Sequence, residues 1–196
     1  MNKRFSDLRR ELDEAITYAD FEVAYEVAER GLDLAHRAED IGEIKYFAAQ
    51  FAIIEEDYLK AIEMLDDAIK YNPHDGAAYN DRALCMVDLG MFEEAIKYFN
   101  LGIIAEPDFA TIYHNKGWLL NKLGQYDDAL KCFETALELE PKRAVTYENM
   151  GDVYLNLNQK SQAICSFQKA LKVLDPVYED IKEELELRLA DIMRSI

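Results

Sequence analysis

The chain of 196 residues lacks the residue patterns that mark a metal site or a disulfide framework. Its three cysteines, Cys85, Cys132 and Cys165, are odd in number and far apart, and its three histidines are equally scattered. Structural zinc needs closely spaced ligand pairs such as C-x-x-C, and none occurs. We therefore expect free thiols in a reducing compartment and no bound metal.

Long apolar runs are also missing. The longest apolar stretch, "YFAAQFAII" from Tyr46, contains a glutamine and is far too short to cross a bilayer. The opening residues, "MNKRFSDLRREL", are charged throughout and contain no apolar run typical of a secretory signal. We expect a cytoplasmic protein without a membrane segment.

Basic residues are scarce, with 22 Lys+Arg against 39 Asp+Glu and a net charge of −17. Residues 1–109 carry 11 basic and 25 acidic side chains, which gives 11 − 25 = −14. Nucleic acids and anionic membranes attract basic surfaces, so this balance disfavours both as partners. Two interpretations stay open: the charge keeps the protein soluble, or it steers neutral or basic partners.

The sequence contains no Gly-rich phosphate loop and no G-x-S-x-G nucleophile motif. Its many acidic residues lie mainly in segments such as "DYLKAIEMLDDAIK", where they fall on outward helix faces. Such residues are more often solubilising charges than paired catalytic carboxylates. We therefore expect no enzymatic activity, no catalytic residues and no cofactor.

What dominates the sequence is a period of 34 residues. Three series of small residues, one of bulky residues and one of prolines keep this period. They are Ala49, Ala83, Gly117 and Gly151; Ala61, Ala95, Ala129 and Ala163; Ala68, Gly102, Ala136 and Ala170; Leu65, Phe99, Phe133 and Phe167; and Pro73, Pro107 and Pro141. Five series locked to one period indicate a repeat protein.

Each period predicts a helical hairpin. From Ala78 to Pro107 the apolar residues fall at helical spacing in two runs, separated by "DLGMFEE". In that segment Gly90 can adopt the positive φ that ends a helix. Small residues allow the two helices to cross closely, and the proline stops the second helix.

This pattern resembles the tetratricopeptide repeat, a helix–turn–helix unit of the same length. The resemblance covers nearly the whole chain and implies an all-α fold, a right-handed α-solenoid that forms one domain over residues 1–196. We expect a degenerate repeat at 5–38, repeats at 42–75, 76–109, 110–143 and 144–177, and a capping helix at 178–196. Repeat 42–75 departs from the family pattern, because Lys45 replaces the opening aromatic and Glu56 the turn glycine. In the segment after Pro176, an apolar stripe is formed by Val177, Ile181, Leu185, Leu189 and Ile192.

In this family, the first helix of every repeat lines a concave groove. The resemblance implies that positions 2, 5, 6, 9, 12 and 13 of a repeat are the lining positions. The candidate binding residues are Tyr46, Gln50, Asn80, Leu84, Thr111, His114, Asn115, Trp118, Asn121, Lys122, Glu148, Asn149 and Asp152. Apolar, amide and acidic groups together suit an extended or helical peptide segment.

Trp118, the only tryptophan, is the most informative of these residues. The expected packing positions around it belong to Tyr113, Gly117 and Leu120, so Trp118 is predicted to face the groove. Tryptophan is the residue type most enriched at binding hot spots. A role in packing against a neighbouring repeat remains open.

Some members of the family hold the terminal carboxylate of heat-shock chaperones with a set of lysine, arginine and asparagine residues. In the two possible frames only Asn115 matches that set, and no cation is present to offset a carboxylate. We therefore exclude that role. The leading hypothesis is a non-catalytic adaptor or scaffold that binds a neutral or basic peptide or protein segment. The alternatives are a dedicated client or secretion chaperone, and a structural subunit that dimerises through Leu187, Ala190 and Met193 of the final helix.

Overall fold

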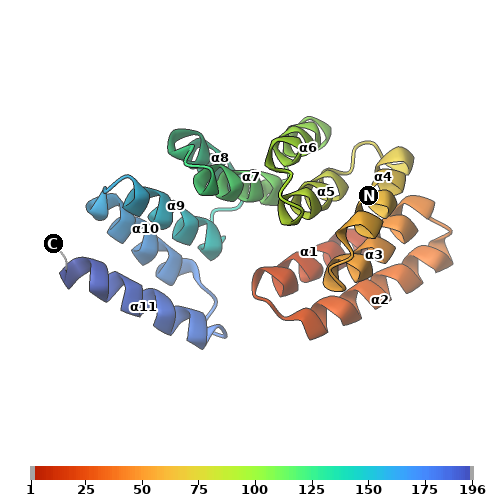
Figure 1. Cartoon of the computed structure of the whole chain (residues 1–196). Helices are drawn as coiled ribbons and strands as arrows, with labels where there is room; N and C mark the ends of the chain where they lie inside the picture. Colours follow the sequence, from red (N-terminus) through yellow and green to blue (C-terminus); the bar gives the residue numbers. More distant parts are fainter. Residues whose placement is uncertain (1–2, 195–196) are drawn as a thin grey trace. The chain divides into compact units, whose positions relative to one another are not determined.

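The computed structural model describes residues 3–194, and over these residues the chain is helical with no strand (Figure 1). The described helices are α1 (Lys3–Thr17), α2 (Phe21–Ala38), α3 (Ile41–Ile54), α4 (Tyr58–Tyr71), α5 (Gly76–Asp88), α6 (Phe92–Ala105), α7 (Ala110–Lys122), α8 (Tyr126–Leu139), α9 (Ala144–Asn156), α10 (Lys160–Val173) and α11 (Glu179–Arg194). The predicted all-α solenoid of stacked hairpins is confirmed.

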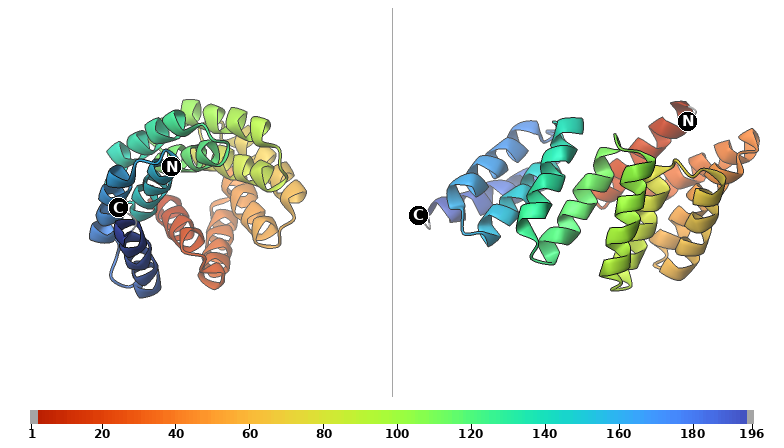
Figure 2. Two further views of the ribbon diagram at one scale, coloured as in Figure 1. Left: turned by 60° about the vertical axis from the view of Figure 1, so that its left-hand side comes forward. Right: turned by 90° about the horizontal axis from the view of Figure 1, so that it is seen from above.

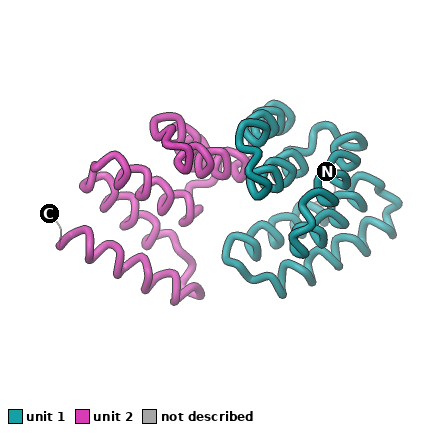
Figure 3. Tube along the Cα trace, viewed as in Figure 1, with its two compact units in different colours: residues 1–107 teal, residues 108–196 magenta. Residues whose placement is uncertain are grey.

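Consecutive helices pair into five hairpins, from α1 with α2 to α9 with α10, and the helices of each hairpin lie side by side (Figure 2). The contacts divide the chain into two compact units, residues 1–107 and 108–196 (Figure 3). Unit 1 holds α1–α6 and unit 2 holds α7–α11. The degenerate first repeat is a complete hairpin, α1–α2, and the prediction of one domain over the whole chain stays a prediction.

The turn inside each hairpin uses one residue in the left-handed region. Gly90 and Gly124 have φ of 76° and 75°, as the glycine in "DLGMFEE" predicts. At the matching place in the other hairpins, Ala19, Glu56 and Asn158 adopt φ of 57°, 59° and 56°. The turn geometry is therefore kept where the glycine is missing, although a side chain makes this conformation less favourable.

Aspartates begin several helices of unit 1. Asp20, Asp40, Asp57 and Asp75 each accept a hydrogen bond from the backbone N–H three residues later. These bonds satisfy amides that have no partner inside the helix. In unit 2 the residues before α7, α8, α9 and α10 form no such side-chain bond. Part of the acidity of unit 1 thus serves to start its helices.

The small residues lie where helices cross, as the period predicts. A Cβ on Gly117 would lie 2.8 Å from the ring of Phe133, and one on Gly151 would lie 2.7 Å from the ring of Phe167. Both phenylalanines are fully buried. Each aromatic ring therefore fills the space that its glycine leaves open.

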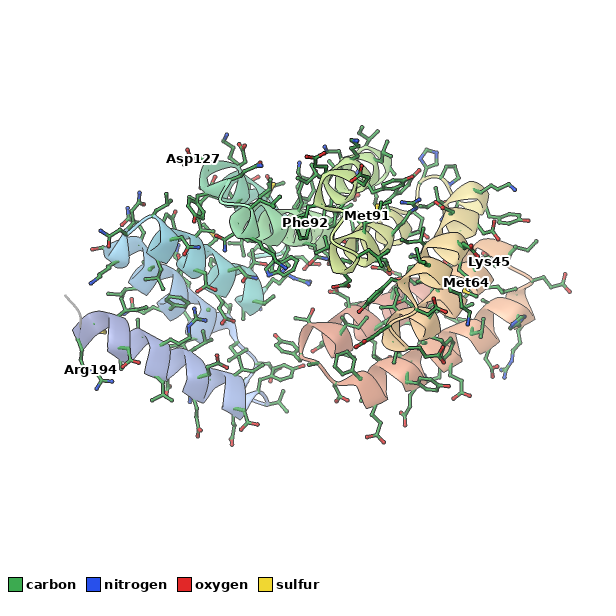
Figure 4. All side chains as sticks on the ribbon, in the orientation of Figure 1. Lys45, Met64, Met91, Phe92, Asp127 and Arg194 are labelled. Carbon is green, nitrogen blue, oxygen red and sulfur yellow. The ribbon has the colours of Figure 1, made fainter. Side chains whose placement is uncertain are left out.

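The departures in repeat 42–75 have local explanations. Lys45 of α3, labelled in Figure 4, stands at the position of the missing aromatic. Its ammonium pairs with Asp67 of α4 at 2.8 Å. Phe47 of α3 lies against Gly31 of α2 and is fully buried. An ion pair and an aromatic contact thus join α3 to the helices on either side of it.

Helix α11 packs on α10, as expected of a cap. Leu185 is buried at its centre, and Ile181, Leu189 and Ile192 are partly buried along the predicted stripe. The expectation for Val177 is wrong: it is 73% exposed, because α11 begins only at Glu179. No described helix is long and apolar enough to cross a membrane.

Candidate interaction surface

The first helices of the two hairpins in unit 2 carry a partly exposed polar and aromatic surface, which we call the α7–α9 wall. It consists of Asn115, Trp118, Asn121 and Lys122 of α7 and Asn149 and Asn156 of α9. Gly117 turns toward Phe133, and Trp118, one residue further round the helix, is consequently only partly buried. The ammonium of Lys122 lies 5.2 Å from the centre of the Trp118 ring, within cation–π range.

Amide side chains lie beside the indole. The Nδ2 of Asn156 donates to the Oδ1 of Asn121 at 3.0 Å, which joins α9 to α7 near their C-terminal ends. A carboxamide can donate and accept at once, so each of these asparagines retains hydrogen-bonding capacity for a peptide backbone. The wall can therefore offer one large aromatic surface and several amide groups to a partner.

A buried hydrogen-bonded chain lies behind the wall. The Nδ1 of His114 lies 2.9 Å from the hydroxyl of Thr146, and the Nδ2 of Asn149 lies 3.4 Å from the Nε2 of His114. Because an amide nitrogen only donates, Nε2 accepts, and the proton of the neutral ring is on Nδ1 and is donated to Thr146. Burial, reinforced by the charge of Arg143, lowers the pKa of His114 to about 3.

We expect His114 to stay neutral throughout the mildly acidic range. Its folded pKa lies below the unfolded value of 6.5, so its contribution to stability is complete above pH 6.5 and is lost as the pH falls toward 3. The free energy of unfolding should fall by about 1.4 kcal/mol per pH unit below 6.5 on account of this residue. In NMR titration the ring signals of His114 should not move between pH 8 and 5. A midpoint near 6 would contradict the buried, neutral ring.

Five of the predicted binding residues are buried, and their polar groups are bonded within the protein. Gln50 and Asn80 donate to Asp81 at 2.8 and 3.0 Å. The residues concerned are Tyr46, Gln50, Asn80, Thr111 and His114. Because these residues are buried, we leave them out of the α7–α9 wall. Leu84 of α5 is partly exposed, but it belongs to unit 1.

The predicted acidic residues of α9 already have a partner. Arg188 of α11 pairs with Glu148 at 2.7 Å and also with Asp152, and its guanidinium lies 4.7 Å from the centre of the Phe167 ring. Burial raises the pKa of both carboxyl groups, and Arg188 opposes that rise. Glu148 and Asp152 thus hold the capping helix in the structure, a role that the repeat pattern did not predict.

The sequence pattern also missed a buried cluster in unit 1. Arg9 of α1 bonds both oxygens of Asp75 at 2.7 and 2.8 Å and Glu43 at 3.0 Å, and its guanidinium lies 3.6 Å over the Tyr46 ring. All four side chains are at most 7% exposed. Glu43 and Asp75 lie 34 and 66 residues after Arg9, so a search for opposite charges about one and two periods apart could have found the cluster.

Among the described residues, no group of three His, Cys, Asp or Glu side chains is arranged to hold a metal ion. The polar groups above instead connect neighbouring helices. Chemically, the α7–α9 wall can contribute stacking, cation–π contacts and amide hydrogen bonds.

Comparisons with known proteins agree with this architecture. Two family models described as tetratricopeptide repeat match residues 52–115 and 108–175, so that together they span well over half of the chain. No curated protein sequence matches the chain.

Several solved structures are similar. TTC0263, a thermophilic tetratricopeptide repeat protein of Thermus thermophilus, superposes with a TM-score of 0.73 at 18% identity, over 96% of this chain and 98% of that one. YrrB, described as having an unusual peptide-binding site, gives a TM-score of 0.61 at 20% identity, over 92% and 88%. The first such domain of Spaghetti (RPAP3), solved with the HSP90 peptide SRMEEVD, gives 0.57 at 19%, over 60% and 94%.

At these identities the solved structures show a shared fold. The family models, the 34-residue period and the five described hairpins all point to the same repeat. The chain belongs to the tetratricopeptide repeat family.

Proposed function

We propose that this protein is a non-catalytic interaction module that binds a peptide or protein segment on the α7–α9 wall. The observation that carries the proposal is Trp118, a partly exposed indole beside Lys122 and a pair of bonded asparagines. A large aromatic side chain that is kept accessible on a rigid helix loses little entropy on binding. Similar folds include proteins whose names describe peptide binding, which supports the same role here.

The partner we propose is neutral or basic. The chain has a net charge of −17, which raises the association rate of a positively charged segment and slows that of an acidic one. Apart from Trp118, the α7–α9 wall consists of four asparagines and one lysine, Lys122, so it does not have several cations that would bind an acidic segment. A peptide backbone with apolar and neutral side chains therefore suits the wall itself. The net charge of the whole chain affects the rate at which the partner associates.

Replacing Trp118 by alanine should weaken binding of the captured partner by about 2 kcal/mol or more, which is about 30-fold in Kd. The partner is first recovered by affinity capture with the wild-type chain, and the Kd is then measured by calorimetry. Tyr71→Ala removes a ring that is 55% exposed on α4 in unit 1 and provides the matched control. Equal affinity of the two variants, with both folded, would reject the α7–α9 wall as the binding surface.

We propose self-association through α11 as a second candidate. Leu187 and Met193 are 65% and 57% exposed on this helix, and Ala190 is exposed between them. Two copies could bury these residues against each other. Light scattering at tens of micromolar tests this candidate, and a monomer at that concentration would remove it.

A further inference from the structure

Unit 2 has a groove on the side of α8 and α10, the second helices of its two hairpins, away from the α7–α9 wall. It lies between α8 and α10, with its floor on α9, and has a volume of about 460 Å³. On α9 the groove contains Tyr147, Met150 and Tyr154, whereas the α7–α9 wall uses Asn149 and Asn156, which project from another side of the helix. The groove and the α7–α9 wall therefore use different faces of the same helix.

The floor of the groove is aromatic and apolar. Tyr147 and Tyr154 are partly exposed at either side of Met150, and burial raises the pKa of Tyr154. Lys116 and Leu120 stand 34 residues before Met150 and Tyr154, so the previous repeat has a cation and an aliphatic residue there. The second tyrosine and the thioether are special to the last repeat.

One wall of the groove is negatively charged. Glu134 and Glu138 are exposed one turn apart on α8, and neither side chain has an ion pair or hydrogen bond among the described residues. Opposite them, the ammonium of Lys169 on α10 lies 5.8 Å from the centre of the Tyr147 ring. The groove thus already holds one cation, Lys169, over Tyr147. The ring of Tyr154 and the carboxylates of α8 are left to bind a second cation from a partner.

We propose that this groove binds an arginine side chain of a protein partner, with the guanidinium over Tyr154 and bonded to Glu134 and Glu138. Arginine suits the groove better than lysine because its flat guanidinium stacks on an aromatic ring and reaches two carboxylates at once. The net charge of −17 favours the approach of a basic segment. The site is separate from the α7–α9 wall, so each can fail without the other.

Cys165 provides a reporter inside the groove. It lines the groove and is exposed, whereas Cys85 is buried and Cys132 is half-buried. Burial raises the pKa of Cys85 to about 12 and also raises the pKa of Cys132, which keeps both thiols protonated and slow to react. Alkylation by N-ethylmaleimide should therefore occur first at Cys165, as mass spectrometry of proteolytic fragments would show.

The probe is the peptide acetyl-Gly-Arg-Gly-amide, compared with the same peptide containing citrulline, a neutral analogue of arginine. We expect the arginine peptide to bind with a Kd of a few millimolar. At a concentration of twice the Kd it fills two thirds of the grooves, so the rate of Cys165 alkylation should fall about threefold. The citrulline peptide should have little effect. Equal protection by both peptides, or none up to about ten times that concentration, would overturn the proposal.

Glu134→Gln combined with Glu138→Gln should abolish the protection. The matched control is Glu179→Gln combined with Glu183→Gln, which removes two exposed carboxylates at the same spacing on α11. That control should be protected like the wild type. If the control loses protection to the same extent as the groove variant, the peptide is responding to net charge and the groove is not its site.

Discussion

Replacing Arg9 by leucine is expected to lower the free energy of unfolding by about 3–5 kcal/mol. The substitution removes the only described cation bonded to Glu43 and Asp75 and leaves both carboxylates buried without it. It also takes away the cation over the Tyr46 ring. Since Asp75 starts α5, the loss should loosen α1, α3 and α5 together. Denaturant titration followed by circular dichroism measures the change, and hydrogen exchange locates it.

Arg30→Leu is the control, because Arg30 pairs with Glu11 on the surface and both side chains are largely exposed. Surface pairs of this kind contribute about 0–1 kcal/mol. If the two leucine variants unfold at the same denaturant concentration, the Arg9 cluster does not hold the first three repeats together.

The pH dependence of the Arg9 variant gives an independent check. Burial raises the pKa of Glu43 above its ordinary value, and Arg9 opposes that rise. A carboxyl group whose folded pKa is raised contributes stability at low pH, and this contribution is lost as the pH rises through the folded pKa. Without Arg9 the pKa of Glu43 should rise further. The stability difference between variant and wild type should therefore shrink as the pH is lowered from 7 to 5.

Replacing Phe47 by alanine should cost about 3–5 kcal/mol, because a fully buried ring is removed from between α2 and α3. Gly31→Ala should cost about 1–3 kcal/mol for the opposite reason. A Cβ on Gly31 would lie 2.2 Å from the ring of Phe47, and that ring also packs near Phe5, with centroids 6.2 Å apart.

The double variant, Gly31→Ala with Phe47→Ala, tests whether the cost of Gly31→Ala comes from its clash with the Phe47 ring. With Phe47 gone, the methyl group of Gly31→Ala occupies free space, so the double variant should be more stable than the sum of the two single losses predicts. The melting temperatures of the four proteins give this coupling. Strict additivity would mean that the ring moves aside in the Gly31→Ala variant and that the two positions do not constrain each other.

The period of small and bulky residues was enough to predict the helices, because a small residue of one series meets a bulky residue of another where two helices cross. Gly117 under Phe133 and Gly151 under Phe167 follow directly from it. The first repeat was harder to predict because three extra residues, Glu39 to Ile41, break the spacing there. Its turn residue is Ala19, and a local propensity argument does not favour a positive φ at alanine.

The candidate site was less predictable, because a position in the repeat does not determine how far its neighbours cover it. Tyr46 occupies a lining position, yet Arg9 from the repeat before it closes over its ring. Glu148 and Asp152 occupy lining positions too, and Arg188 bonds to both from a helix with no counterpart in the period. Such contacts depend on the reach of single long side chains, which a spacing pattern does not contain.

The chain from Asn149 through His114 to Thr146 means that the repeats are not interchangeable parts. If residues 110–143 were duplicated in tandem, the first copy of His114 would meet the second copy's Ile112 where it now meets a hydroxyl, because Ile112 stands 34 residues before Thr146. The imidazole N–H would then be enclosed with no acceptor for its proton. An engineer who wishes to lengthen this array must therefore redesign both sides of each new junction.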